Sequence, residues 1–397
     1  MSETTTPKPP VWIIPTIVFS QFAGTSLWFA GNAVLGDLQA YLKITGDQVL
    51  GSITSSVQLG FIAGTLVFAF FAISDKFSPR KIFLVCALLG ATANLAILWL
   101  ATNLFSLLLF RFVTGFFLAG IYPIGMKIAA GWYQKSLGKA IGFLVGALVL
   151  GTAFPHFLKS IGGALSWQVV LQSVSIIAAL GGIAMYLLVP DGPYISKGSA
   201  FNPKVLLQMF RTKDFRSAAF GYFGHMWELY TFWAFVPIML QHYAALNQWN
   251  TNFSLWAFII IAVGSLGCII GGFVSGKTGS ARVAFFQLLV SGILCLISPL
   301  LFHLPLFLFL ALLVIWGTVV VGDSPQFSAL TAKTAPKEYV GSALTIVNSL
   351  GFAITIFSIQ LANYLYTVIN PNYIFMALVV GPLFGLWYMR PLAKRGF

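Results

Sequence analysis

The chain has 397 residues, of which 58% are hydrophobic and only 8% are charged, and its mean hydropathy is +0.90. A soluble domain carries about a quarter charged residues, so this composition excludes an ordinary globular protein. Apolar stretches of about 20 residues, long enough to cross ~30 Å of hydrocarbon, recur along the whole sequence. The net charge of +13 does not by itself indicate a nucleic-acid partner, because in a membrane protein the placement of positive charges is more informative than their sum. The composition predicts an all-α polytopic membrane protein.

The first apolar segment follows a short polar tail, MSETTTPKPP, which lacks the basic start of a signal peptide. Because that segment is too long for a cleaved core, we expect a retained span. The three cysteines, Cys86, Cys268 and Cys295, lie inside apolar segments without a CxxC pattern. They are interpreted as packing residues, and we expect neither a metal site nor a cofactor.

Twelve apolar segments follow one another along the chain, and most are separated by short polar joints typical of helical hairpins. The longer joint at 190–216 contains PDGPY and five Lys or Arg, which indicates a linker. We therefore predict a six-helix bundle over 1–189, a cytoplasmic linker over 190–216 and a second six-helix bundle over 217–397. The segments begin near Val11, Val49, Ile82, Phe105, Gly138, Gln168, Ala218, Phe253, Val283, Pro305, Ser342 and Ile374.

The positive charges predict the orientation of these spans. With the N-terminus inside, the cytoplasmic joints, the linker and the two tails hold all the basic residues except Lys43, Lys159 and Arg111. This bias follows the positive-inside rule and accounts for the net charge without nucleic acid. We expect an inner-membrane or plasma-membrane protein with both termini in the cytoplasm.

The two halves of the chain repeat each other at a nearly constant separation of about 200 residues. Each match alone is weak, but four in the same order indicate a duplication, and transporters built from such repeats bind substrate at the repeat interface. GTSLWFA from Gly24 matches GHMWELY from Gly224, DKFSPR (75–80) matches GKTGSAR (276–282), GIYP (120–123) matches GDSP (322–325), and GKAIG (138–142) matches GSALT (341–345).

The loop after the second span, SDKFSPRK (74–81), is similar to the G-x-x-x-D-[RK]-x-G-x-[RK]-[RK] signature of the major facilitator superfamily, which the chain resembles over essentially its whole length. The resemblance implies twelve transmembrane helices in two pseudo-symmetric six-helix bundles, and alternating-access transport. In the family this loop packs against helix ends of the other half and helps to gate the inner face. The resemblance therefore assigns gating to Asp75 and Arg80, and to Lys277 and Arg282 in the second copy.

The fourth span contains RFVTGFFLAG (111–120), which is similar to the family's R-x-x-x-G-x-G signature at Arg111 and Gly115, although Phe117 replaces the second glycine. In proton-driven family members this arginine is associated with proton coupling. The fifth span, GFLVGALVLGTAFP (142–155), resembles the glycine-rich helix of exporters. Small-xxx-small spacing is also ordinary helix packing in membranes, so the motif does not decide the direction of transport.

Few ionisable residues lie within spans, and each costs several kcal/mol there unless it faces the bundle or a cavity. In GHMWELYTFW (224–233), His225 and Glu228 share one helical face. A carboxyl group in such a cavity suits the uptake and release of a proton. Each residue also has a structural interpretation. In that interpretation Glu228 is a hydrogen-bonded residue that joins helices, and His225 bonds a neighbouring backbone group or hydroxyl. Asp323 in GDSPQ caps a helix break. The candidates for proton coupling are Glu228, Arg111, Asp323 and His225, and His156 is a weaker one.

Aromatic and amide side chains of several spans are candidates for the substrate site, where they would suit a flat or cationic solute. Core packing is equally consistent with them. In the family the seventh span lines the central cavity, which led us to expect Glu228 to face Arg111 across it. The candidate substrate residues are Trp28, Asn32, Gln58, Tyr122, Trp227, Tyr230, Trp233, Trp316 and Asn348.

The leading hypothesis is a proton-coupled secondary transporter of a small organic solute, acting as a monomer on a small-molecule substrate and protons in the lipid bilayer. The chain has no GxxxxGK[ST] loop for an ATP-driven pump, and no recognisable Ser/His/Asp set for an enzyme. Nitrate-type anion porters of the family resemble each other in having an arginine in both the second and the eighth span. These spans lack arginine here, which disfavours that alternative. A metal porter would use His225, Glu228 and Asp323 as ligands. A membrane receptor or lipid-handling protein on the same fold is the remaining alternative.

Overall fold

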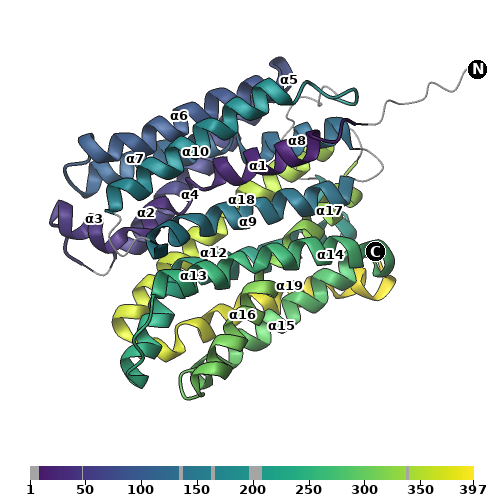
Figure 1. The fold of residues 1–397 in the computed structure, drawn as a ribbon. Helices are drawn as coiled ribbons and strands as arrows, with labels where there is room; N and C mark the ends of the chain where they lie inside the picture. Colours follow the sequence, from purple (N-terminus) through teal and green to yellow (C-terminus); the bar gives the residue numbers. More distant parts are fainter. Residues whose placement is uncertain (1–8, 47, 134–136, 162–165, 196–207, 337–338) are drawn as a thin grey trace, which may run out of the picture.

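The protein is an almost entirely helical bundle in which the helices run side by side (Figure 1). The computed structural model describes residues 9–46, 48–133, 137–161, 166–195, 208–336 and 339–397. In chain order the helices are α1 (Ile13–Thr25), α2 (Ala30–Ala33), α3 (Leu35–Leu42), α4 (Val49–Phe70), α5 (Ile73–Lys76), α6 (Pro79–Leu100), α7 (Leu104–Leu118), α8 (Tyr122–Trp132), α9 (Leu137–Ile161), α10 (Trp167–Leu188), α12 (Lys213–Asn247), α13 (Phe253–Ala262), α14 (Gly264–Thr278), α15 (Ser280–Leu301), α16 (Leu306–Gly322), α17 (Ser324–Thr334), α18 (Val340–Val368) and α19 (Val380–Arg395), with 3₁₀ turns at Pro371–Tyr373 and Phe375–Val379.

The observed helices match the predicted spans closely. Within the described ranges, 10 spans, some of them two helices in line, are long and apolar enough to cross a membrane. The other two predicted spans are the first, which breaks after the 13-residue α1, and the seventh, which is the 35-residue α12. Local signals set several helix starts: α6 has a proline in its first turn, and Asn103 and Ser106 form a capping box before α7.

Breaks occur at corresponding places in the two halves. The fourth span breaks between α7 and α8, just before Pro123, and the tenth breaks at Asp323, just before Pro325. Proline cannot donate the backbone hydrogen bond that would continue the first segment. The first and seventh spans differ, because α1 ends at Thr25 whereas its counterpart α12 continues without a break.

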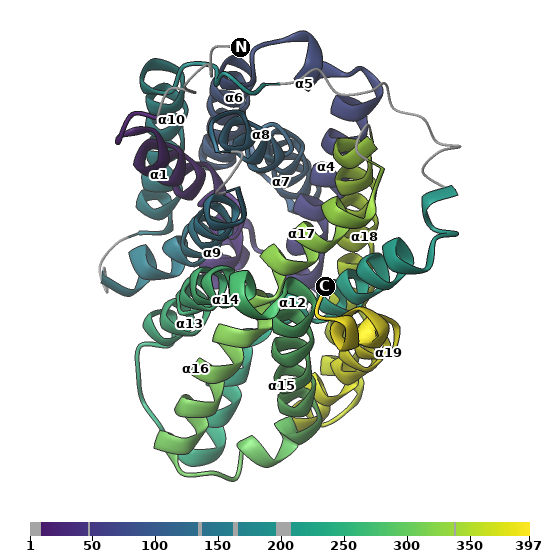
Figure 2. The ribbon, with the colours of Figure 1, turned by 90° about the vertical axis from the view of Figure 1, so that its right-hand side faces the viewer.

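The first six spans and the last six form two bundles that meet along a long interface (Figure 2). Within the first bundle α4 packs on α7 and α6 on α10, and within the second α12 packs on α19 and α14 on α16. Between the bundles, α4 contacts α18, while α9 contacts α13 and α14. The start of α1 and the end of α19 lie toward the right in Figure 1, and we call that end of the bundle the terminal end.

The two bundles touch at both ends of their interface. At the terminal end, Thr65 of α4 hydrogen-bonds Ser349 of α18 at 3.1 Å. At the opposite end, the Gln360 amide donates to Ser55 at 2.9 Å. The contact between α9 and α13 is also closed at the opposite end, where the Asn252 amide donates to the Ser160 carbonyl at 2.8 Å. Contacts at both ends leave the centre of the interface covered in this conformation.

Close helix crossings depend on particular glycines. A Cβ atom at Gly60 of α4 would overlap the backbone carbonyl of Phe112 on α7, and one at Gly115 would overlap that of Val57. In contrast, a Cβ at Gly36 of α3 would meet open space. Small residues that let backbones approach are the usual device for packing helices in membranes.

We predict that Gly60→Ala lowers the free energy of unfolding by about 1–3 kcal/mol, because overpacking forces the backbones of α4 and α7 apart. Gly36→Ala is the matched control and should be neutral or slightly stabilising, since glycine within a helix costs about 0.5–1 kcal/mol relative to alanine. Thermal unfolding of the two variants in detergent measures the difference. Equal unfolding temperatures would show that the crossing tolerates a methyl group.

Candidate functional site

The first span is interrupted over Ser26–Phe29, close to the middle of the bundle. The hydroxyl of Thr25 donates to the Gln21 carbonyl at 2.8 Å, and that of Ser26 donates to the Ala23 carbonyl at 2.7 Å. Side-chain bonds of this kind compete with the helical pattern and bend helices. The interruption leaves backbone carbonyls without their helical hydrogen bonds. Backbone groups at the depth of the membrane must find hydrogen-bond partners within the protein, so these carbonyls need other donors.

Arg111 of α7 supplies those donors. Its guanidinium donates from Nη1 to the Leu27 carbonyl at 3.1 Å and from Nη2 to the Trp28 carbonyl. Nη1 also donates to Asn94 Oδ1 of α6 at 3.1 Å. Arg111 is fully buried, so a planar cation with several donors replaces the missing helical bonds of the first span.

Asn94 connects this arginine to a third helix. The Asn94 amide nitrogen donates to Ser175 Oγ at 3.0 Å and to the Leu171 carbonyl at 3.3 Å, both on α10. Arg111 therefore belongs to a network that joins α6, α7 and α10 to the break in the first span. The sequence reasoning did not select Asn94, although a buried asparagine within an apolar span is a signal that could have found it.

An aromatic layer fills the centre of the interface between the bundles, and we define it as Trp28, Phe61, Tyr230 and Phe352. The Trp28 ring lies 5.0 Å from Phe61, 5.6 Å from Tyr230 and 5.4 Å from Phe352, measured between ring centroids. All four side chains are buried. Rings from the broken first span and α4 thus pack directly on rings from α12 and α18, which joins the two halves at their centre.

Glu228 of α12 lies inside the second bundle, and its side chain is almost completely buried. Its Oε1 atom accepts hydrogen bonds from Trp316 Nε1 at 2.6 Å, Ser291 Oγ at 2.5 Å and Cys295 Sγ at 3.2 Å. The donors come from α15 and α16. All three bonds that the structure describes for this carboxyl come from uncharged donors.

His225 and Asp323 form a second buried polar pair, one turn along α12 from Glu228. His225 Nδ1 lies 2.8 Å from Asp323 Oδ1, an ion-pair distance, although the two groups are not aligned for a hydrogen bond. Among the described residues, His225 Nε2 and Asp323 Oδ2 have no hydrogen-bond partner. Because Asp323 sits at the break between α16 and α17 while Trp316 is on α16, His225 and Glu228 both reach the tenth span.

Arg111 and Glu228, which we expect to face each other across a shared cavity, are bonded within different bundles in this structure. The described hydrogen bonds of Arg111 all go to the first bundle, and those of Glu228 all come from the second. The physical reason is the break in the first span, whose free carbonyls attract the guanidinium. The repeat comparison alone could not reveal this break.

The predicted substrate residues divide into two groups. Trp28 and Tyr230 belong to the aromatic layer, and Trp233 lies against Phe29 at 6.3 Å between ring centroids, so these three are at the interface. Trp227 packs instead against Gly381 on another face of α12, and Trp316 contacts Phe232 and Glu228 within the second bundle. These two indoles therefore lie away from the interface, where the substrate site is expected.

The polar members of that set lie close to the interface or beside it. The Asn32 amide donates to Thr54 of α4 at 2.7 Å. Tyr122 and Asn348 are buried, at the start of α8 and in the first half of α18. Gln58 is also fully buried, and neither its amide nitrogen nor its amide oxygen has a partner in the part of the chain that the structure describes. His156, the weaker candidate for proton coupling, is likewise buried.

The predicted gating residues lie at the terminal end. The Asp75 side chain lies outside the described residues. Arg80 contacts Asp191 Oδ1 at 4.0 Å and donates to the Tyr186 carbonyl at 3.3 Å, so it ties the start of α6 to the end of α10. In the second copy Arg282 donates to the Ala393 carbonyl at 3.4 Å, while Lys277 lies in the last turn of α14.

Comparison with known families identifies the chain. The model of the Major Facilitator Superfamily matches residues 16–359. The chain therefore belongs to this family of membrane transporters, and it is an integral membrane protein. No curated protein sequence matches it.

Solved structures of this family are similar to the chain in fold. The human organic anion transporter MFSD10 has a TM-score of 0.71 at 16% identity, covering 96% of this chain and 100% of that one. A bacterial homologue of the human lysosomal transporter Spinster, inward-facing and occupied, has a TM-score of 0.68 at 16% identity, covering 97% of both chains. A proton:xylose symporter bound to 6-bromo-6-deoxy-D-glucose has a TM-score of 0.72 at 13% identity, covering 96% of both. At these identities the likeness establishes the fold alone.

We predict that Arg111→Lys destabilises the protein although it keeps the charge. A lysine ammonium cannot reach two carbonyls and Asn94 in the same planar arrangement, and a hydrogen bond to a charged group is worth about 1.5–3 kcal/mol. The expected result is a lower unfolding temperature in detergent. Arg80→Lys, at the partly exposed end of α6, is the control and should change it little. An unchanged unfolding temperature for Arg111→Lys would contradict the role assigned to the guanidinium.

Proposed function

We propose that the protein is a proton-coupled secondary transporter that moves a small organic solute across the inner or plasma membrane by alternating access. In this proposal the bundles of residues 1–189 and 217–397 move against each other, both termini are cytoplasmic, and the monomer is the working unit. The observation that carries the proposal is Glu228, a buried carboxyl whose described partners are three uncharged donors in the middle of a membrane bundle.

The chemistry of this carboxyl suits reversible protonation. Burial penalises the ionised form, whereas three donors on one oxygen stabilise it, so the two influences oppose each other. Trp316 Nε1 can only donate, and it can remain bonded to Oε1 when a proton sits on the other carboxyl oxygen. Glu228 therefore keeps its hydrogen bond from Trp316 in both protonation states, which suits a site that binds and releases a proton repeatedly.

The His225–Asp323 pair supports a second proton station on the same helix face. It lies nearer the terminal end than Glu228, at a break in the tenth span. Broken helices line transport paths in secondary transporters. We infer that protons pass between Glu228 and the terminal end by way of this pair.

The solute site is proposed at the interface, around the aromatic layer. Trp28 and Tyr230 come from different bundles and would separate when the bundles move, which exposes ring faces to a flat or cationic solute. The amide of Gln58, which lacks a described partner, is available to a polar group of the solute. Anion binding at Arg111 is disfavoured, because Nη1 and Nη2 already bond backbone carbonyls.

A metal porter receives little support from the geometry. In the described part of the chain, no group of three or more His, Cys, Asp or Glu lies close enough together to hold a metal ion. His225 and Asp323 form a pair, whereas Glu228 is bonded to Ser291, Cys295 and Trp316.

We predict that Glu228→Gln abolishes uphill, proton-driven accumulation while solute exchange continues. Glutamine keeps an oxygen that can accept from Trp316 but cannot bind and release the proton. Candidate solutes are first found by thermal shift, since a bound ligand stabilises the protein by mass action. Transport is then measured in proteoliposomes carrying a pH-sensitive dye. Asp37→Asn, which removes a partly exposed carboxylate paired with Lys159, is the control. Uphill transport by Glu228→Gln at the wild-type rate would refute the coupling role.

We predict that Asp323→Asn slows proton uptake by at least about tenfold, because a positioned acid or base contributes roughly 10²-fold or more to proton transfer. Asparagine keeps the size of the side chain, and the Asp323 side chain makes no cap hydrogen bond to α17 that the change would remove. The unfolding temperature should therefore stay close to that of the wild type. If stability falls and proton uptake does not, Asp323 is a structural cap and not a proton station.

A further inference from the structure

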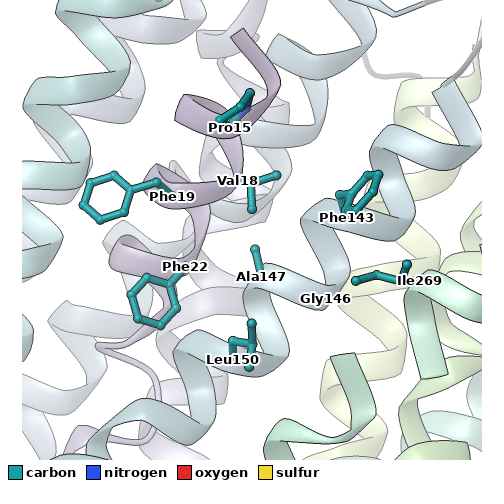
Figure 3. Close-up of a pocket in the computed structure, with 9 residues that line it drawn as sticks. All are labelled: Pro15, Val18, Phe19, Phe22, Phe143, Gly146, Ala147, Leu150 and Ile269. Atoms are coloured by element: carbon teal, nitrogen blue, oxygen red, sulfur yellow. The ribbon is translucent and has the colours of Figure 1, made fainter. Parts of the chain in front are cut away.

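An apolar groove lies on the outer surface of the bundle, away from Glu228 and the aromatic layer. Its volume is about 480 Å³, and its walls come from α1, α9 and α14 (Figure 3). Phe19, Phe143 and Leu150 are among its walls and are 37–45% exposed, so the groove opens sideways toward lipid. The lining residues are all uncharged and, apart from glycine, hydrophobic: Pro15, Val18, Phe19, Phe22, Phe143, Gly146, Ala147, Leu150 and Ile269.

The groove is closed at its deep end. A Cβ at Gly151 of α9 would meet the Thr25 hydroxyl and the Phe22 carbonyl of α1, so the two backbones touch there. The Phe22 and Phe154 rings also pack edge to face at 5.1 Å. From this closure the groove runs toward the terminal end, where Pro15 and Phe143 lie.

Two lysines continue the walls of the groove at the terminal end. Lys139 is one helical turn before Phe143 on α9, and its ammonium lies 5.2 Å from the Phe273 ring centroid. Phe273 is one turn beyond Ile269 on α14, and Lys277 is one turn further on the same face. The apolar groove therefore ends at a pair of positive charges, both on exposed residues.

The dimensions match one leaflet of a bilayer. The eleven-residue separation of Lys139 and Leu150 corresponds to ~16 Å along a helix, about half of the ~30 Å hydrocarbon core. Trp12, which is 55% exposed, precedes α1 at the same end. Tryptophan and lysine at one level mark the interface between hydrocarbon and headgroups.

We propose that this groove is a binding site for an anionic phospholipid of the leaflet at the terminal end, with an acyl chain along α1 and α9 and the headgroup phosphate between Lys139 and Lys277. The charge at the mouth and the apolar, leaflet-deep groove behind it fit this occupant in both chemistry and length. A zwitterionic lipid fits the groove equally well but gains less from the two lysines.

The site joins the two bundles, because α1 and α9 belong to the first and α14 to the second. At this place the backbones are close: a Cβ at Gly142 would lie 3.4 Å from the Cys268 carbonyl, and one at Gly146 would lie 3.4 Å from that of Ser265. A lipid that contacts both sides binds this arrangement more tightly than one in which α9 and α14 separate. It therefore favours the closed conformation through its differential affinity.

The test measures lipid binding to the purified protein, independently of transport. Delipidated protein is titrated with phosphatidylglycerol or with phosphatidylcholine of the same acyl chains, and bound lipid is counted by native mass spectrometry alongside the thermal shift. We expect the wild type to prefer phosphatidylglycerol. Equal retention of the two lipids by the wild type would overturn the headgroup assignment.

Two variants separate the headgroup from the acyl chain. The double variant Lys139→Gln, Lys277→Gln should reduce the preference for phosphatidylglycerol by roughly five- to thirtyfold, since each lysine near an anionic surface contributes about a factor of five. Val18→Trp fills the groove and should reduce binding of both lipids at least about fivefold. If Val18→Trp lowers stability without lipid, Leu150→Trp, from a more exposed wall, replaces it.

Matched controls lie elsewhere on the bundle. Lys81→Gln removes an exposed lysine near the start of α6, and Ile183→Trp adds an indole to the exposed face of α10. Both controls should bind lipid as the wild type does. A preference for phosphatidylglycerol that survives the double lysine variant would overturn the headgroup site, and unchanged binding by the groove-filling variant would overturn the acyl site. Neither result would bear on proton coupling at Glu228.

Discussion

The hydrogen bonds from Arg111 to the interrupted first span are the interaction on which the rest of the centre depends. Backbone at membrane depth must be satisfied within the protein, and the interruption leaves the Leu27 and Trp28 carbonyls in need of donors. Arg111 supplies the donors for both carbonyls and is itself hydrogen-bonded to Asn94. One buried cation therefore replaces the missing helical hydrogen bonds. With the backbone held in this way, the Trp28 ring reaches across the interface to α12 and α18.

Within the described residues, the second bundle has no equivalent interruption that would leave backbone carbonyls in need of a donor. Its counterpart of the first span, α12, is helical throughout this region, and the buried residue aligned with Trp28 is Glu228. The donors that surround this carboxyl come from α15 and α16, as neighbours of a continuous helix. The two related bundles therefore have different centres: a cation that supports backbone in one, and a buried carboxyl held by uncharged donors in the other.

The different functions proposed for Arg111 and Glu228 follow from this asymmetry. A cation already bonded to backbone is poorly placed to pass a proton or hold an anionic solute, whereas a carboxyl among neutral donors is well placed to bind and release a proton. The aromatic layer lies between the two centres and belongs to both bundles. The apolar groove lies on the outside of the same interface, where α9 and α14 meet. In the proposed mechanism, solute, proton and lipid would each act on contacts that change when the bundles move.

Much of the architecture could be predicted from the sequence because it depends on local properties. The length and apolarity of each segment located the spans within a few residues, and the repeats indicated two bundles. The repeat also aligned Trp28 with Glu228. The interruption after Thr25 had weaker signals, since threonine and serine also occur within intact membrane helices. Without that break the partner of Arg111 could not be inferred.

By itself, the sequence determined that this is a twelve-span membrane bundle of two related halves, because hydrophobic length and charge placement act locally on each segment. It also indicated which few ionisable residues lie within the spans. Only the tertiary structure decided which groups those residues meet. Helical spacing gave His225 and Glu228 a common face but did not identify Trp316 or Asp323 as their neighbours, and it left Trp227 and Trp316 indistinguishable from interface residues. Those choices depend on how helices distant in the sequence rotate and pack, since a side chain's partner is set by the neighbouring helix and not by its own.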